Sequence, residues 1–119
     1  SKDAFDSLYH NFADLHNEEF WILALNRANQ IIKKVCISHG GFSGTVADPK
    51  VIFKKALELS ASSIILAHNH PSGNTTPSQP DTMLTTKLIE AGKFLDLPVL
   101  DHLIFGENDF YSFKDEGIF

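Results

Sequence analysis

Two histidines near the middle of the chain, His68 and His70, have a spacing that suits a metal ion. The apolar run before them predicts extended backbone, in which side chains two residues apart leave the same face, with Cα atoms about 6–7 Å apart. Both imidazoles can therefore converge on one ion. Asp81 could add a carboxylate oxygen from the first turn of a following helix. Two imidazoles and one carboxylate leave a tetrahedral position open for water, so the pattern indicates a catalytic zinc site.

The full motif is more specific than its two histidines alone. A His-x-His pair arises easily by chance among six histidines. With Pro71, Ser78 and Asp81 at fixed distances, the chance probability falls to the order of 10⁻⁴. Plainer interpretations remain open: the histidines could be strand-end side chains bonded to backbone, and Asp81 could only close a helix-capping box that begins at Ser78. Because a carboxylate has two oxygens, Asp81 can have both roles.

The elements that must hold these residues alternate between helix and strand. A continuous apolar run, typical of a buried strand, ends directly at His68, and Ser78 is placed to start the next helix. The two earliest strands read as an antiparallel hairpin. This alternation indicates an α/β sandwich around a mixed sheet. Helices are expected at 3–14, 49–59 and 78–95, and strands at 20–25, 31–37, 64–67, 99–105 and 110–113.

At the motif residues the sequence resembles the JAMM (MPN) metalloprotease family, whose motif is a glutamate followed by His-x-His-Pro-x6-Ser-x2-Asp. The stretch from His68 to Asp81 agrees with this spacing. Segments 67–73, 90–93 and 99–102 look like the bacterial RadC-like branch, and the likeness runs from about Glu18 to the C-terminus. The resemblance implies a three-layer α/β/α sandwich with a mixed sheet, the cytidine-deaminase-like (JAB1/MPN) fold.

The resemblance also implies roles for the matching residues. It implies Zn²⁺ held by His68, His70 and Asp81, while Ser78 donates a hydrogen bond to the oxyanion. A glutamate on the first core strand would be the general base.

Two glutamates, Glu18 and Glu19, precede the strand at 20–25. Adjacent strand residues point to opposite faces, so only one of them can reach the metal. RadC-like sequences usually have the glutamate two residues before a Phe, which selects Glu18 as the general base. Glu19 is the alternative, and Glu18 would then be a solvated charge beside the strand.

The polar pair Asp101-His102 interrupts the apolar strand at 99–105. One of these side chains could orient a metal ligand through a hydrogen bond. The other explanation is a buried polar group that bonds to neighbouring backbone.

Composition limits the class of protein. With 119 residues, 43% of them hydrophobic, residues 1–119 are long enough for a single domain. We expect this to be the C-terminal domain of a longer protein, with residues 1–16 as a helical lead-in. The single cysteine, Cys36, and the lack of any apolar run near the ~20 residues of a membrane span predict a cytoplasmic protein without membrane contact.

Together these features predict a zinc-dependent hydrolase, a metallopeptidase or isopeptidase of JAMM type that acts on a peptide or protein substrate. The alternative is a DNA-repair-associated factor in which the MPN domain is a binding scaffold, suggested by the historical name of the RadC-like branch. The net charge of −5 disfavours this, so nucleic acid would be contacted only through another domain. Nucleobase deamination requires His-x-Glu and Pro-Cys-x-x-Cys motifs that the sequence lacks.

Overall fold

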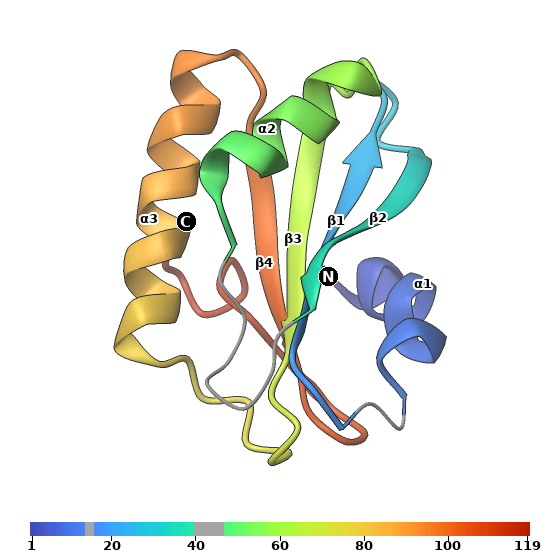
Figure 1. The fold of residues 1–119 in the computed structure, drawn as a ribbon, viewed down its shortest axis with the longest axis vertical. Helices are drawn as coiled ribbons and strands as arrows, with labels where there is room; N and C mark the ends of the chain where they lie inside the picture. The colour runs from blue at the N-terminus through green and yellow to red at the C-terminus, as the bar shows by residue number, and fades with distance from the viewer. Residues whose placement is uncertain (14–15, 40–46) are drawn as a thin grey trace.

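The computed structural model describes residues 1–13, 16–39 and 47–119, and this part of the chain contains three helices and five strands (Figure 1). The elements follow one another in the predicted order, helix, two strands, helix, strand, helix and two strands. They are α1 (Lys2–Phe12), β1 (Glu19–Leu25), β2 (Ile31–His39), α2 (Pro49–Glu58), β3 (Ser63–Asn69), α3 (Gln79–Phe94), β4 (Val99–Phe105) and β5 (Phe110–Ser112).

The strands form one mixed sheet in the order β2-β1-β3-β4-β5. β1 pairs antiparallel with β2 and with β3, β3 and β4 are parallel, and β4 pairs antiparallel with β5. Phe20 lies opposite His68, so the start of β1 meets the end of β3. The crossover helix α3 also begins at this end, because it leads from the end of β3 to the start of the parallel strand β4.

Helices cover both faces of the sheet (Figure 1). α1 packs on one face, where its Leu8 joins a buried cluster with Leu23 of β1. α2 and α3 pack on the other face, where Ile52 and Leu88 join a second cluster with Ile22. Because Ile22 and Leu23 are adjacent in β1, their opposite directions follow from the strand period. The arrangement confirms the predicted α/β sandwich with a mixed sheet.

Local sequence explains where α2 and α3 start. The Asp48 side chain caps α2 by accepting a hydrogen bond from the Lys50 N–H at 2.9 Å, and Pro49 occupies the first turn. α3 has Ser78 as its N-cap. The buried face of α2 is centred on Ile52, Phe53 and Ala56, whereas Val51 is 39% exposed.

Two expectations fall partly on residues that the structure does not describe. α1 ends at Phe12, and the last residue of the helix predicted at 3–14 lies outside the described residues. The glycine-rich stretch at 40–44, expected to be irregular, lies outside them as well. No helix in the described part of the chain combines the length and apolar content that crossing a membrane requires.

Candidate metal centre

Three elements bring the predicted site residues to one end of the sheet. His68 lies in β3 and His70 follows directly after that strand, with the two ring centroids 5.0 Å apart. Glu18 directly precedes β1, the antiparallel neighbour of β3. Asp81 is the third residue of α3. The site is therefore built where one strand ends, another begins and the crossover helix starts.

The donor atoms of His68, His70 and Asp81 have the spacing that a metal ion requires. The two Nε2 atoms are 3.2 Å apart, and His70 Nε2 is 3.2 Å from Asp81 Oδ2. His68 Nε2 is 3.3 Å from Asp81 Oδ1. Ligands at about 2.0–2.1 Å from a tetrahedral zinc are about 3.3–3.4 Å from one another. Each Nε2 atom contacts a different oxygen of the Asp81 carboxylate, so the three side chains converge on one small space, and two imidazole nitrogens with a carboxylate oxygen are a donor set that suits zinc.

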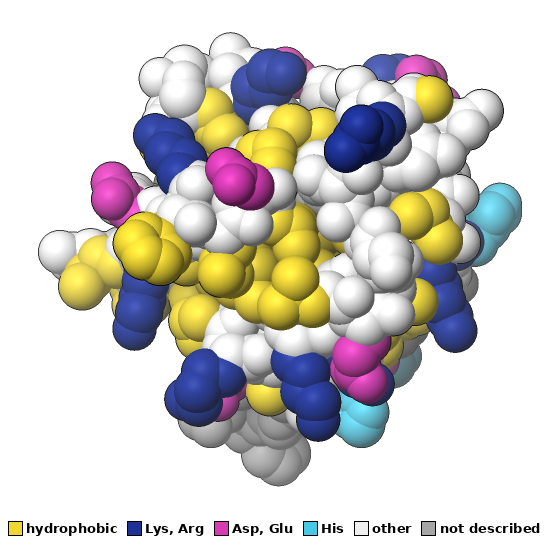
Figure 2. Space-filling view, turned by 90° about the horizontal axis from the view of Figure 1, so that it is seen from above, with side chains coloured by type: hydrophobic (Ala, Val, Ile, Leu, Met, Phe, Trp, Pro, Cys, Tyr) yellow, Lys and Arg dark blue, Asp and Glu magenta, His cyan; other side chains and the backbone are white. Residues whose placement is uncertain are grey.

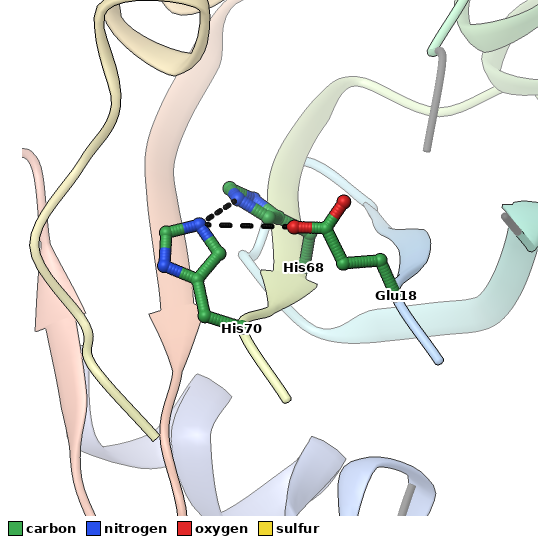
Figure 3. A group of neighbouring side chains, drawn as sticks. All are labelled: Glu18, His68 and His70. Atoms are coloured by element: carbon green, nitrogen blue, oxygen red, sulfur yellow. Dashed lines mark hydrogen bonds and ion pairs between the residues drawn. The ribbon is translucent and has the colours of Figure 1, made fainter. Parts of the chain in front are cut away.

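Glu18 lies beside the two histidines (Figure 3). Its Oε1 is 3.9 Å from His70 Nε2, and the donor atoms of Glu18, His68 and His70 all lie within 4.8 Å of one another, a group that could hold a metal ion. Glu19 is engaged elsewhere, because its Oε1 accepts a hydrogen bond from Trp21 Nε1 at 2.9 Å. Of the two predicted candidates, the structure brings Glu18 to the histidines.

Asn69, between the two histidines, holds the backbone on both sides of Glu18. Its buried side chain accepts a hydrogen bond from the Glu19 N–H at 2.7 Å and donates one to the Asn17 carbonyl at 3.1 Å. These two groups belong to the peptide units that flank Glu18. β3 thus presents imidazoles from one face and fixes the backbone of the neighbouring carboxylate from the other.

Hydrogen bonding orients His70 towards the site. Its Nδ1 is 2.7 Å from the Asn74 carbonyl oxygen, which can only accept, so Nδ1 carries a proton and Nε2 faces Asp81. Metal-binding histidines commonly donate their second ring N–H in this way. The hydrogen bond with Asp81 raises the pKa of His70; burial opposes this rise, and the Asn74 carbonyl supports it.

Asp81 serves the start of α3 and the site together. In a capping box, Asp81 Oδ2 accepts from the Ser78 N–H at 2.9 Å, and Ser78 Oγ accepts from the Asp81 N–H at 3.2 Å. Burial acts to raise the pKa of the Asp81 carboxyl, but its contacts with His68 and His70 hold that pKa well below its usual range. The carboxylate is therefore ionised, and both roles considered for Asp81 are geometrically compatible.

The two polar residues of β4, His102 and Asp101, have different surroundings: one contacts a site histidine and the other bonds to neighbouring groups. His102 approaches the site: it is fully buried, with its Nε2 2.8 Å from His68 Nδ1 and its Nδ1 2.6 Å from Thr85 Oγ1. Burial lowers the pKa of His102 well below its usual value, so this imidazole is neutral. Asp101 instead accepts hydrogen bonds from the backbone N–H groups of His102 and Lys114 and from the Ser112 hydroxyl.

A cleft of about 540 Å³ adjoins His70. Tyr9 and Phe12 of α1 line one side of it. The loop at 70–73 and the β4–β5 turn at 106–108 line the rest. The cleft combines aromatic side chains with polar groups.

Sequence reasoning missed two residues that contact the site residues, Asn69 and Thr85. Thr85 lies one helical turn after Asp81, and this spacing could have indicated it. Asn69 carried no such signal, because its partners come from the chain about fifty residues earlier and depend on the pairing of β1 with β3.

Comparisons with known proteins agree with this geometry. The family model described as "RadC-like JAB domain" matches residues 1–118. A UPF0758 protein of Flavobacterium johnsoniae is 50% identical over 119 residues, which are all of this chain and 52% of the relative. A UPF0758 protein of Methanosarcina barkeri is 42% identical over 116 residues, covering 98% of this chain and 51% of the relative. The chain thus spans about half the length of these curated relatives.

Proposed function

The chain belongs to the RadC-like JAB domain family, and from this membership and its site we propose that it is a zinc-dependent hydrolase that cleaves amide bonds. One observation carries the proposal: two imidazole Nε2 atoms and a carboxylate lie 3.2–3.3 Å apart at the end of β3. The three-layer arrangement further supports the cytidine-deaminase-like JAB/MPN fold that the resemblance implies.

In this proposal His68, His70 and Asp81 hold the metal. Bound zinc would lower the pKa of a water molecule towards about 7 and polarise a carbonyl group. The two imidazoles supply neutral nitrogen, and Asp81 supplies an ionised oxygen whose charge offsets part of that of a dication. Three protein ligands leave a fourth tetrahedral position for water or substrate, which is typical of catalytic rather than structural zinc.

Glu18 and Ser78 complete the reaction machinery. The Glu18 carboxylate accepts a proton from the attacking water and returns it to the leaving amine. The Ser78 oxygen accepts from the Asp81 N–H, which orients the hydroxyl so that its own proton can be donated to the developing oxyanion. The roles of Glu18 and Ser78 rest on their positions in the family motif and on their proximity to the histidines or to Asp81.

We propose a peptide or protein as the substrate. The cleft next to His70 supports this, because Tyr9 and Phe12 offer aromatic contact while most of the remaining lining, including the turns at 70–73 and 106–108, is polar. Since the chain spans about half the length of its relatives, the activity, substrate and partners of the whole protein belong to the same proposal.

The metal site is tested by measuring the zinc content of protein purified without added zinc. We expect about one zinc per chain, as a three-ligand set with one open position predicts. His68→Ala and Asp81→Ala should lose the metal. A protein that takes up no zinc under any loading condition would overturn the proposal.

The base is tested with Glu18→Gln and the matched control Glu19→Gln. On a peptide identified from a fluorogenic library, Glu18→Gln should keep zinc and lose about 10²–10⁴-fold in kcat, because it removes the proton acceptor. Glu19→Gln, which alters a carboxylate hydrogen-bonded to Trp21, should keep both the bound zinc and the wild-type kcat. If Glu18→Gln turned over substrate as fast as the wild type, Glu18 could not be the general base.

The DNA-linked alternative has weaker support in the described residues. The net charge is −5. At the end of the molecule where α2 and α3 finish, Lys and Arg side chains are separated by acidic and hydrophobic ones and form no continuous stripe (Figure 2). Phosphate binding needs clustered positive charge. Tight, salt-dependent DNA binding that persists in His68→Ala would favour a scaffold over a hydrolase.

A further inference from the structure

We propose that His102 and Thr85 are positioning residues that fix His68 as its Nδ1–H tautomer and turn its Nε2 lone pair towards the metal. The inference rests on the proposed zinc site and concerns how that site is prepared. It follows from a continuous chain of short contacts that runs from α3 through β4 to β3.

The first proton in this chain belongs to Thr85. Its Oγ1 is 2.7 Å from the Asp81 backbone oxygen and 2.6 Å from His102 Nδ1. A hydroxyl has one proton and a carbonyl oxygen only accepts, so Thr85 donates to Asp81. The contact between Thr85 Oγ1 and His102 Nδ1 then needs a proton from the imidazole, so His102 must be protonated at Nδ1.

The second step places the proton of His68. His102 is fully buried, stacked on Phe113 with ring centroids 4.8 Å apart, and its ring nitrogens face a hydroxyl and another imidazole. In this apolar setting the ring is neutral, so the Nδ1–H form has its lone pair on Nε2. His68 Nδ1, 2.8 Å from that lone pair, must therefore donate.

A neutral His68 with its proton on Nδ1 has a free lone pair on Nε2, the atom that lies 3.2 Å from His70 Nε2 and 3.3 Å from Asp81 Oδ1. The chain of contacts also closes on the site, because Thr85 bonds to the backbone of Asp81. Two proposed ligands on different elements are thus joined through two residues that do not reach the metal. His68 in the other tautomer could not bind through Nε2.

The test compares isosteric and conservative substitutions at both positions. Thr85→Val removes the hydroxyl but keeps the shape, and Thr85→Ser restores the hydroxyl. With no acceptor at Thr85, His102 can move its proton to Nε2, which forces the His68 proton onto its own Nε2. His102→Leu removes the acceptor for His68, and His102→Gln offers an amide oxygen in its place.

Two measurements separate positioning from a merely structural role. Long-range ¹H–¹⁵N NMR of the metal-free protein, at a pH where the imidazoles are neutral, reports the His68 tautomer, and chelator competition reports zinc affinity. We expect Nδ1–H at His68 in the wild type, and a mixture of tautomers in Thr85→Val. We also expect a loss of about 10–100-fold in zinc affinity for His102→Leu and Thr85→Val. Thr85→Ser and His102→Gln should remain close to wild type.

Phe113→Leu, which disturbs the packing of His102 but leaves its hydrogen bonds, should keep the tautomer. The proposal is overturned if folded Thr85→Val keeps His68 as Nδ1–H and binds zinc as the wild type does. If His102→Leu does not fold, the Thr85 pair decides the matter. If the wild type binds no zinc, the proposed function fails, while the tautomer measured without metal still decides this inference.

Discussion

Asp81 and His70, two of the proposed metal ligands, form a close pair of ionisable side chains. Their side chains are mostly buried, and His70 Nε2 lies 3.2 Å from Asp81 Oδ2. The pKa of His70 is raised and the pKa of Asp81 is lowered. A proton on His70 then holds the position that a dication would otherwise fill. In the proposed metal site, binding would therefore exchange a metal ion for this proton.

This exchange predicts a window of pH in which the pair stabilises the metal-free protein. Because the pKa of the Asp81 carboxyl is lowered by folding, it stabilises the folded protein at pH values above its unfolded pKa of about 3.9. Because the pKa of His70 is raised by folding, it stabilises the folded protein below its unfolded pKa of about 6.5, and this stability is lost as the pH rises through the folded pKa. In EDTA, Asp81→Asn should therefore cost most between these values, on the order of 1 kcal/mol. Urea unfolding across pH 3–9 measures this.

The Asn side chain can still accept the capping hydrogen bond, so the substitution isolates the charge. Asp6→Asn is a suitable control, because Asp6 pairs with Lys2 on the exposed surface of α1. A cost for Asp81→Asn that does not vary with pH would contradict the predicted window.

At the scale of elements, the loop between β3 and α3 holds His70 through close backbone contact. His70 N–H donates to the Phe105 carbonyl at 3.0 Å, and Gly73 N–H donates to the His70 carbonyl at 2.9 Å. Gly106, next in the chain after β4, leaves room for this loop: a Cβ there would lie 2.7 Å from the Gly73 carbonyl oxygen. The absence of a side chain at 106 therefore lets the loop rest on the end of β4.

Gly106→Ala should displace the loop and weaken zinc binding. Overpacking of this kind costs about 1–3 kcal/mol, and we expect zinc affinity to fall as His70 shifts. Gly92→Ala is the matched control, since a Cβ there would lie 2.6 Å from the Leu97 carbonyl oxygen, near the far end of α3. Both variants should unfold more easily, and only Gly106→Ala should lose zinc affinity in chelator competition. An equal loss in both would contradict the argument.

How far the sequence predicts this structure also depends on the element. α3 was predictable because Ser78 and Asp81 make its start with local hydrogen bonds, and β3 because its apolar run is continuous. The position of Glu18 beside His70 was expected only from the family motif. Its physical cause is the β1–β3 pairing and the Asn69 contacts, which join segments about fifty residues apart and leave no local pattern.

For the whole molecule, the site brings together side chains from three different parts of the fold. His68 belongs to β3, Asp81 to α3 and Glu18 to the segment before β1. A ligand that binds only the folded arrangement stabilises all of them at once. Zinc should therefore raise the stability of the entire domain rather than of one loop.

This predicts that the unfolding midpoint depends on free zinc. At a free zinc concentration one hundred times Kd, the added free energy of unfolding is about 2.7 kcal/mol. Thermal unfolding in buffered zinc and in EDTA measures the difference. His70→Ala, which lacks one ligand, should show a much smaller shift, and an equal shift in both proteins would mean that zinc acts elsewhere.

The contacts of Asn69 have one more consequence. The segment from 68 to 70 sets two positions: that of the imidazoles directly, and that of Glu18 through the hydrogen bonds of Asn69 to the backbone on both sides of Glu18. Because the same segment holds both, the distance between Glu18 and the histidines should change little when β3 slides or tilts. Insertion of one residue within this segment should instead disrupt the arrangement, because the residues after the insertion would turn to the opposite face relative to those before it.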